Sequence, residues 1–179
     1  MSSFHSLPTH CGRLPMRYNL AMPIEFTFLA DRIDAIPIIS EWYFDEWGHL
    51  VQGASIERTR GRIEDYLNRD EIPFILVATN DNDLVGAAQL KYHEMAEMFP
   101  DKEHWLGGVY VAASHRGQGY GSQIVEQIVK MAPRYGVETL HLQTEALDGG
   151  LYARLGWTPC AQVTSRGLDV LVMEQQLSG

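Results

Sequence analysis

The sequence has little cysteine and no long apolar run. Only two of its 179 residues are cysteines, Cys11 and Cys160, which lie far apart without a Cys-x-x-Cys motif. We therefore expect reduced thiols rather than a disulfide. The first 22 residues lack the apolar core of a signal peptide, and no apolar run reaches the length of about 20 residues that crosses a bilayer. These absences predict a cytoplasmic protein without a membrane span.

Basic residues are also few: Lys and Arg number 14 against 23 Asp and Glu, which gives a formal net charge of −9. A surface of this sign repels nucleic-acid phosphates and anionic lipid headgroups. Nucleic acid and membrane surfaces are therefore not expected as partners. An acidic surface favours a cationic substrate such as an amine, although net charge says little about the field inside one cleft.

The histidines show no spacing typical of metal ligands. Neither a His-Glu-x-x-His motif nor a comparable pair occurs, so we expect no functional metal at any of His5, His10, His49, His115 and His141.

Length and pattern predict one domain of mixed α/β class, α+β in type. At 179 residues and 45% hydrophobic content, one sizeable core can form. Residues 1–22 are expected to be a flexible N-terminal extension and residues 23–179 the domain. The patterns predict strands at 24–29, 74–79, 84–92, 105–112, 137–144, 158–165 and 168–176, and helices at 33–47, 55–68, 119–132 and 148–155.

A glycine-rich turn at residues 116–121 joins a predicted strand to a predicted helix. The first turn of a helix leaves backbone N–H groups unpaired at the positive end of the macrodipole, which suits a phosphate. Glycines at 117, 119 and 121 let a phosphate approach those amides. A tight turn without a ligand is the alternative. The Rossmann fingerprint fails because residue 122 is Ser, and the Gly-Lys-Ser/Thr ending of a P-loop is missing.

Two segments in register resemble one family. The run Arg116-Gly-Gln-Gly-Tyr-Gly121 resembles the Arg/Gln-x-x-Gly-x-Gly/Ala motif of the GNAT acyltransferase superfamily. Leu151-Tyr152-Ala-Arg-Leu-Gly156-Trp157 is similar to the family's Leu-Tyr-x-x-x-Gly-Phe segment, with Trp in place of Phe. The resemblance covers roughly residues 24–176. It implies a mixed, mostly antiparallel sheet of six to seven strands flanked by about four helices.

The resemblance also implies an N-acetyltransferase that uses acetyl-CoA as cosubstrate. The turn would bind the CoA pyrophosphate, and the fourth strand would pair with the pantetheine arm. The implied CoA-binding residues are Val109, Tyr110, Val111, Arg116, Gly117, Gln118, Gly119, Tyr120, Gly121 and Ser122. The acceptor would be a primary amine of a small molecule or peptide, which attacks the thioester directly.

The catalytic residues implied by the resemblance are Tyr152 as the acid near the CoA sulfur and a base near the fourth strand. Tyr152 is alternatively a packing aromatic. The candidate bases are Glu103 and His104, with Glu94 and His93 beside them. Trp105 occupies a position where some relatives carry the carboxylate, so no direct assignment is made. A solvated loop role is the alternative for these residues.

The resemblance places the first helices and the loop 94–103 at the acceptor cleft. Candidate lining residues are Trp42, Tyr43, Trp47, Met95, Met98 and Phe99, with ordinary core packing as the alternative for the two tryptophans.

Two other functions and a homodimer remain open from the sequence. A non-catalytic acyl-CoA sensor would bind the same ligand without turnover. A protein that binds nucleotides or phosphorylated metabolites would use the same turn for a different ligand. Exposed terminal strands could pair edge to edge into a homodimer.

Overall fold

The computed structural model describes residues 24–177. The predictions of a flexible extension over residues 1–22 and of a reduced thiol at Cys11 lie outside the described residues. Cys160 carries a free thiol. Within residues 24–177 no helix is both long and apolar enough to pass through a bilayer.

Within the described part of the chain, seven strands form one sheet in the order β1-β2-β3-β4-β5-β7-β6. All neighbouring strands are antiparallel except β4 and β5. The mixed, mostly antiparallel sheet predicted above is thus confirmed. The strands are β1 (Glu25–Phe28), β2 (Phe74–Asn80), β3 (Asp83–Tyr92), β4 (His104–Val111), β5 (Thr139–Thr144), β6 (Thr158–Ser165) and β7 (Leu168–Gln176).

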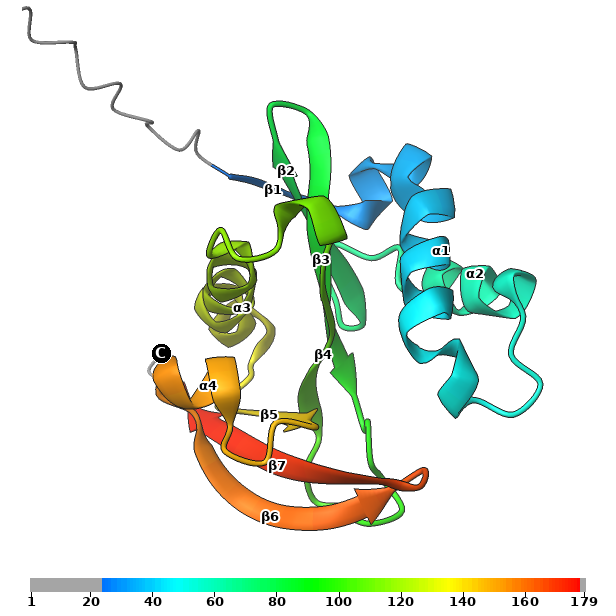
Figure 1. The fold of residues 1–179 in the computed structure, drawn as a ribbon. Coiled ribbons are helices and arrows are strands. Elements are labelled where there is room, and N and C mark those ends of the chain that lie inside the picture. The colour runs from blue at the N-terminus through cyan, green and yellow to red at the C-terminus, as the bar shows by residue number, and fades with distance from the viewer. Residues whose placement is uncertain (1–23, 178–179) are drawn as a thin grey trace, which may run out of the picture.

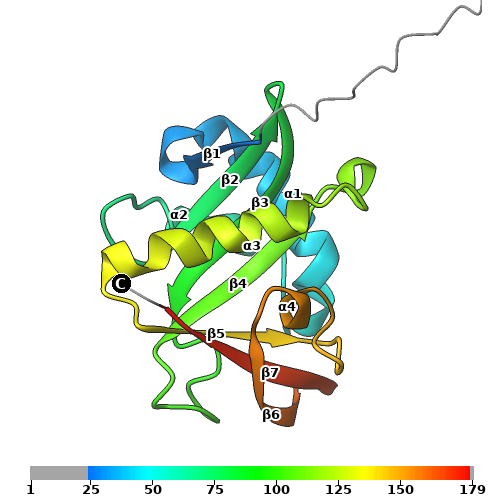
Figure 2. The ribbon, with the colours of Figure 1, turned by 90° about the vertical axis from the view of Figure 1, so that its left-hand side faces the viewer.

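Helices cover both faces of this sheet (Figures 1 and 2). One face carries α1 (Ile36–Trp47) and α2 (Ile56–Glu64), and the opposite face carries α3 (Tyr120–Met131) and α4 (Gly150–Arg154). Alternation along β2 explains the two-sided burial. Phe74 and Leu76 belong to the core cluster beneath α3, whereas Ile75 and Val77 belong to the cluster beneath α1.

All four predicted helices are shorter in the structure, and the first two show why. Residues 33–35 form a 3-10 turn, and the α-helix begins at Ile36. Pro37 therefore lies in the first turn, where a backbone N–H has no partner within the helix and its absence costs no hydrogen bond. The second helix is capped by Ser55, whose hydroxyl accepts from the Arg58 amide at 3.3 Å. It ends at Glu64 rather than residue 68 because the chain turns there. The Asn68 side chain holds that turn by donating to the Pro73 carbonyl at 2.7 Å.

The parallel strands β4 and β5 touch only at one end. Their single register pair is Trp105 with His141, at the start of β4. Beyond it the two strands diverge, which is clear in Figure 2, where they leave a common end in different directions. The split opens the middle of the sheet between the two helical layers.

Candidate active site

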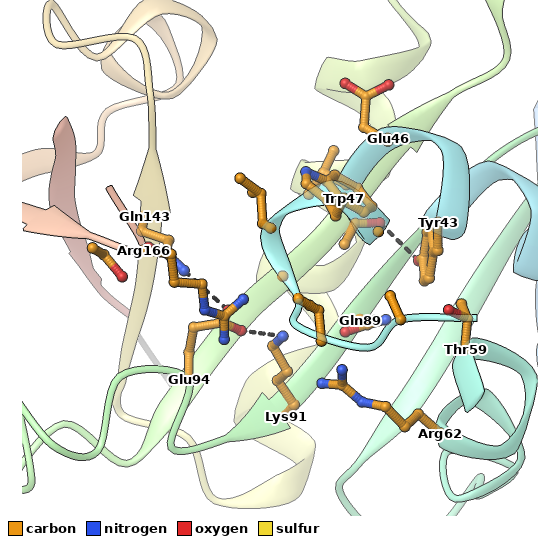
Figure 3. Close-up of a pocket in the computed structure, with 18 of the residues that line it drawn as sticks. Tyr43, Glu46, Trp47, Thr59, Arg62, Gln89, Lys91, Glu94, Gln143 and Arg166 are labelled. Atoms are coloured by element: carbon orange, nitrogen blue, oxygen red, sulfur yellow. Dashed lines mark hydrogen bonds and ion pairs between the residues drawn. The ribbon is translucent and has the colours of Figure 1, made fainter. Parts of the chain in front are cut away.

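A cavity of about 560 Å³ lies where β4 and β5 part. Its walls come from α1, the loop that follows it, α2, β3, β4, the end of β5, and the hairpin between β6 and β7. Tyr152 of α4 lines it as well, although α4 lies on the opposite face of the sheet from α1 and α2. The cavity therefore reaches from the α1 and α2 face into the gap between the two strands (Figure 3).

A β-bulge in β4 shapes the floor of the cavity. The register between β3 and β4 shifts between Ala87 and Gln89. Gly108 has φ of 54°, and a Cβ built there would lie 2.8 Å from the Tyr43 hydroxyl oxygen, so the position requires glycine. The Tyr43 hydroxyl donates to the Gly108 carbonyl at 2.8 Å. This bond fixes α1 against the bulge.

Among residues 24–177, the edge of β4 that faces β5 has no strand partner after Trp105. On its other edge β4 pairs with β3 as far as Val111. Val109 and Val111 pack on the α3 side, and Tyr110 stacks on Trp42 of α1 with ring centroids 5.0 Å apart. The peptide groups of residues 106–111 that face the gap are thus available to an extended ligand that adds itself as a strand, except the Gly108 carbonyl, which Tyr43 binds, and the Val111 carbonyl, which Arg116 binds.

The glycine turn at the start of α3 presents unpaired amides. Among the described residues, no acceptor is found for the backbone N–H groups of residues 117–122. Gly117 and Gly119 have φ of 77° and 82°, and a Cβ at either would meet nothing within 4 Å. Gly121 differs, since it lies within the helix and has no positive φ. The turn is exposed beyond the C-terminal end of β4 and forms an open anion site.

The side chains of this turn hold its shape. The Arg116 guanidinium donates to the Val111 carbonyl at 3.0 Å and pairs with Glu46 of α1 at 3.5 Å. The Gln118 amide donates to the Ser114 carbonyl at 3.3 Å. Tyr120 is buried, and its hydroxyl accepts from Asn80 at 2.6 Å. The capacity of the turn to bind an anion therefore resides in its backbone amides.

Tyr152 offers a phenol to the cavity. Burial raises the pKa of Tyr152 to about 12, so the hydroxyl stays protonated at neutral pH. Its ring packs edge-on against Trp157, with centroids 6.1 Å apart. No hydrogen bond involving the Tyr152 hydroxyl is found within residues 24–177. The group is thus a neutral donor without a partner at the cavity wall.

Of the four candidate bases, only Glu94 lines the cavity. Its carboxylate pairs with the Lys91 ammonium and accepts from the Gln143 amide at 3.0 Å (Figure 3). Burial by itself would raise the pKa of Glu94, but the Lys91 charge and the bonds from Lys91 and Gln143 outweigh burial and hold this pKa below its usual value. Glu94 is therefore ionised at neutral pH and is only a weak proton acceptor.

Glu103, His104 and His93 lie outside the cavity lining. Glu103 is exposed, and its carboxylate lies 3.9 Å from the His104 ring, which packs beside Tyr92. These two residues precede or begin β4 where the strand still pairs with its neighbours, so the split opens beyond them. Within residues 24–177 no group of three or more His, Cys, Asp or Glu side chains is arranged to hold a metal ion.

The six side chains suggested for the acceptor pocket divide into two sets. Tyr43 and Trp47 line the cavity. The other four do not: Trp42 stacks on Tyr110, Met95 and Phe99 pack in the cluster around Trp105, and Met98 is exposed. Apart from Glu94, the loop 94–103 thus contributes to core packing, and the two aromatic side chains of this group that line the cavity come from α1.

Sequence patterns did not indicate most of the polar side chains in the cavity. They come from α2, β3, β5 and the last hairpin, so no local motif joins them. They are Arg58, Arg62, Gln89, Lys91, Gln143 and Arg166. The one local signal is the pair Gly107-Gly108 within a strand, because glycine there is typical of a bulge or of close backbone approach.

Solved structures share this fold. The structure of yncA from Salmonella typhimurium, which contains its cofactor acetyl-CoA, superposes with a TM-score of 0.66 at 22% identity, covering 88% of this chain and 95% of that chain. The ribosomal-protein-alanine N-acetyltransferase of Brucella melitensis has a TM-score of 0.66 at 24% identity, with 87% and 100% covered. An aminoglycoside 6'-acetyltransferase type Ii has a TM-score of 0.65 at 18% identity, with 88% and 99% covered.

A sequence search among curated proteins finds no significant match. The model of the acetyltransferase (GNAT) family matches residues 36–157, from the start of α1 to the residue after Gly156. This range contains the split strands, the glycine turn and Tyr152, and it is more than half of the chain. The protein therefore belongs to the GNAT family of acetyltransferases.

Proposed function

We propose that this protein is an N-acetyltransferase that moves the acetyl group of acetyl-CoA directly to an amine. The observation that carries the proposal is one continuous track along β4. Unpaired amides at the glycine turn stand at one end, an unpaired strand edge follows, and a cavity with a phenol at its wall stands at the other end.

The track matches the parts of acetyl-CoA in order. The pyrophosphate binds the amides of residues 117–122, where charge and helix dipole favour an anion. The pantetheine arm carries two amides and pairs with the β4 edge over residues 109–111, as an added strand would. The thioester then reaches the cavity near Gly108 and Tyr152. The yncA structure has the same fold and contains acetyl-CoA, which supports acetyl-CoA as the ligand.

The amine attacks the thioester carbon while both substrates are held together, so much of the rate enhancement is positioning. A C–N bond forms, the C–S bond breaks, and the electron pair of that bond leaves on sulfur as thiolate. The Tyr152 phenol donates a hydrogen bond to this thiolate, which then takes up one proton as CoA leaves. The amine enters as ammonium and loses two protons in becoming an amide, so one proton is released per turnover.

The reactive amine must be neutral. With a lysine-like pKa near about 10.4, roughly one molecule in a few thousand is neutral at pH 7. Glu94 is ionised and partly buried at the cavity wall, where its carboxylate, although paired with Lys91, can accept a hydrogen bond from the ammonium. Because its pKa is low, the proton passes to water, and Glu94 acts by positioning the amine.

Turnover tests the proposal. The protein is incubated with acetyl-CoA and a panel of amines, and thiol release is followed together with the acetylated product by mass spectrometry. We expect amine-dependent release of CoA that falls sharply in Tyr152→Phe. Tight binding of acetyl-CoA with no turnover of any amine would instead indicate the non-catalytic sensor, and a preference for ATP or NAD over CoA in thermal-shift assays would indicate a nucleotide-binding protein.

A further inference from the structure

We propose that the acceptor amine carries a second, anionic group, a carboxylate or a phosphate, which Arg62 and Arg166 bind at the cavity. This inference rests on the proposed acetyl transfer and specifies its acceptor class.

The charge of the cavity differs from that of the chain. Acidic residues outnumber basic ones by 23 to 14 in the whole sequence. The cavity lining contains four basic residues, Arg58, Arg62, Lys91 and Arg166, against three acidic ones, Glu46, Glu94 and Glu145. An acidic protein thus surrounds this one space with a slight excess of positive charge, so the net charge of the chain does not describe the charge of the cavity.

Internal pairing accounts for several of these charges. Lys91 pairs with Glu94, and Glu46 pairs with Arg116, which is not part of the lining. The Arg58 guanidinium donates to the Gly53 carbonyl at 2.7 Å and holds the loop after α1.

Two guanidinium groups remain for a ligand. Among the described residues, no hydrogen bond or ion pair is found for the side chains of Arg62 and Arg166. One acidic lining residue, Glu145, likewise has no basic partner there, and it is exposed at the far end of β5. The net charge of the cavity lining around the two guanidinium groups is therefore positive.

Arg62 and Arg166 reach the same place from different elements. Arg62 extends from α2 and Arg166 from the turn between β6 and β7, and Figure 3 shows both heads directed toward Lys91 and Glu94. This centre lies over Gly107, since a Cβ built there would be 2.8 Å from the Lys91 ammonium and 3.3 Å from the Glu94 carboxylate. A guanidinium binds carboxylate or phosphate through paired N–H groups, so two of them form a site for such an anion.

The phosphates of acetyl-CoA are a poor explanation for these cations. Lys91 is opposite Trp105, at the start of β4, whereas the glycine turn follows Val111 at its end. The two ends are separated by the length of β4, about 20 Å at the rise of a strand. The cations therefore stand at the acceptor end, where Glu94 can attract the ammonium of the same molecule. Opposite charges side by side fit an acceptor that is itself zwitterionic.

Matched acceptor pairs test this inference with the full chain and saturating acetyl-CoA. One arm compares L-amino acids with their carboxamides, and a second arm compares aminoalkyl phosphates with the corresponding amino alcohols, which separates carboxylate from phosphate. We expect at least one anionic amine to have a kcat/KM about 10-fold or more above its neutral counterpart, as for loss of a hydrogen bond to a charged group. In Arg62→Gln and Arg166→Gln the KM for that acceptor should rise by about the same factor, with the KM for acetyl-CoA unchanged.

Arg60→Gln is the matched control. Arg60 is exposed on the same helix as Arg62, pairs with Glu64 and does not line the cavity, so its variant should keep the wild-type preference. Arg62 and Arg166 are themselves exposed, so their variants should fold. Equal or better acetylation of the neutral amines, or a preference that survives in both variants, would overturn the inference and leave the acetyltransferase proposal standing. Failure of every amine, charged or neutral, would overturn both.

Discussion

Replacing Gly119 by alanine should have two effects that can be measured separately: a loss of folding stability from backbone strain and a loss of acetyl-CoA affinity at the anion site. Gly119 has φ of 82°, and an alanine Cβ there would meet no protein atom within 4 Å. The cost to folding is therefore that of the left-handed backbone alone, about 1–2 kcal/mol, or roughly 2–8 °C in Tm for a chain of this size. The added methyl would instead occupy the open space that the pyrophosphate needs. Loss of one hydrogen bond to a charged phosphate predicts acetyl-CoA binding weaker by about 10- to 150-fold.

Gly136 supplies the control for this prediction. It has φ of 77°, its Cβ would also meet nothing within 4 Å, and it lies after α3, outside the cavity lining. Gly136→Ala should thus lose similar stability by thermal denaturation but bind acetyl-CoA as wild type by isothermal titration calorimetry. Gly121→Ala should also fold, because its Cβ would make only ordinary contacts at 3.5 Å and 3.7 Å. Equal acetyl-CoA affinity in the Gly119 and Gly136 variants would refute the assignment of the anion site.

Three further outcomes are expected. In steady-state assays, Tyr152→Phe should lower kcat by about 10- to 100-fold, because the hydrogen bond to the thiolate is lost, and should leave the KM for acetyl-CoA nearly unchanged. An unchanged kcat would show that Tyr152 only packs against its neighbours. The logarithm of kcat/KM should rise by one unit per pH unit below the pKa of the amine. Since burial raises the pKa of Tyr152 to about 12, no decline should appear near pH 10; a decline there would contradict its role as donor. Tyr43→Phe should destabilise the fold by about 1–3 kcal/mol in urea titrations, because the partly buried Gly108 carbonyl loses its donor, whereas exposed Tyr92→Phe should not. Equal stability of the two variants would show that this hydrogen bond does not stabilise the packing of α1 on the bulge.

Local patterns predicted the parts of the site that depend on neighbours in sequence. The turn at residues 116–121 could be foreseen because glycine spacing, a preceding strand and a following helix together determine where amides point. Tyr152 came from a motif of seven residues and does reach the cavity. The seven strands were placed nearly to their ends because the apolar or alternating runs of the sequence are bounded by turns.

The acceptor side could not be predicted in the same way. Arg62, Lys91, Gln143 and Arg166 lie on four different elements, and only the strand order and the split between β4 and β5 bring them together. The family resemblance placed the loop 94–103, with its apolar residues Met95, Met98 and Phe99, at the acceptor cleft. Met95 and Phe99 instead pack around Trp105, which is fully buried against Met95 and the last strand. An apolar loop is equally consistent with packing and with binding until its neighbours are known.

The most direct measurement is a crystal structure of the protein with bound acetyl-CoA. The pyrophosphate should accept hydrogen bonds from the backbone amides of residues 117–122, the pantetheine should lie along the free edge of β4, and the thioester should stand near the Tyr152 hydroxyl. A pyrophosphate bound away from those amides, or a pantetheine arm outside the gap between β4 and β5, would contradict this mode of acetyl transfer.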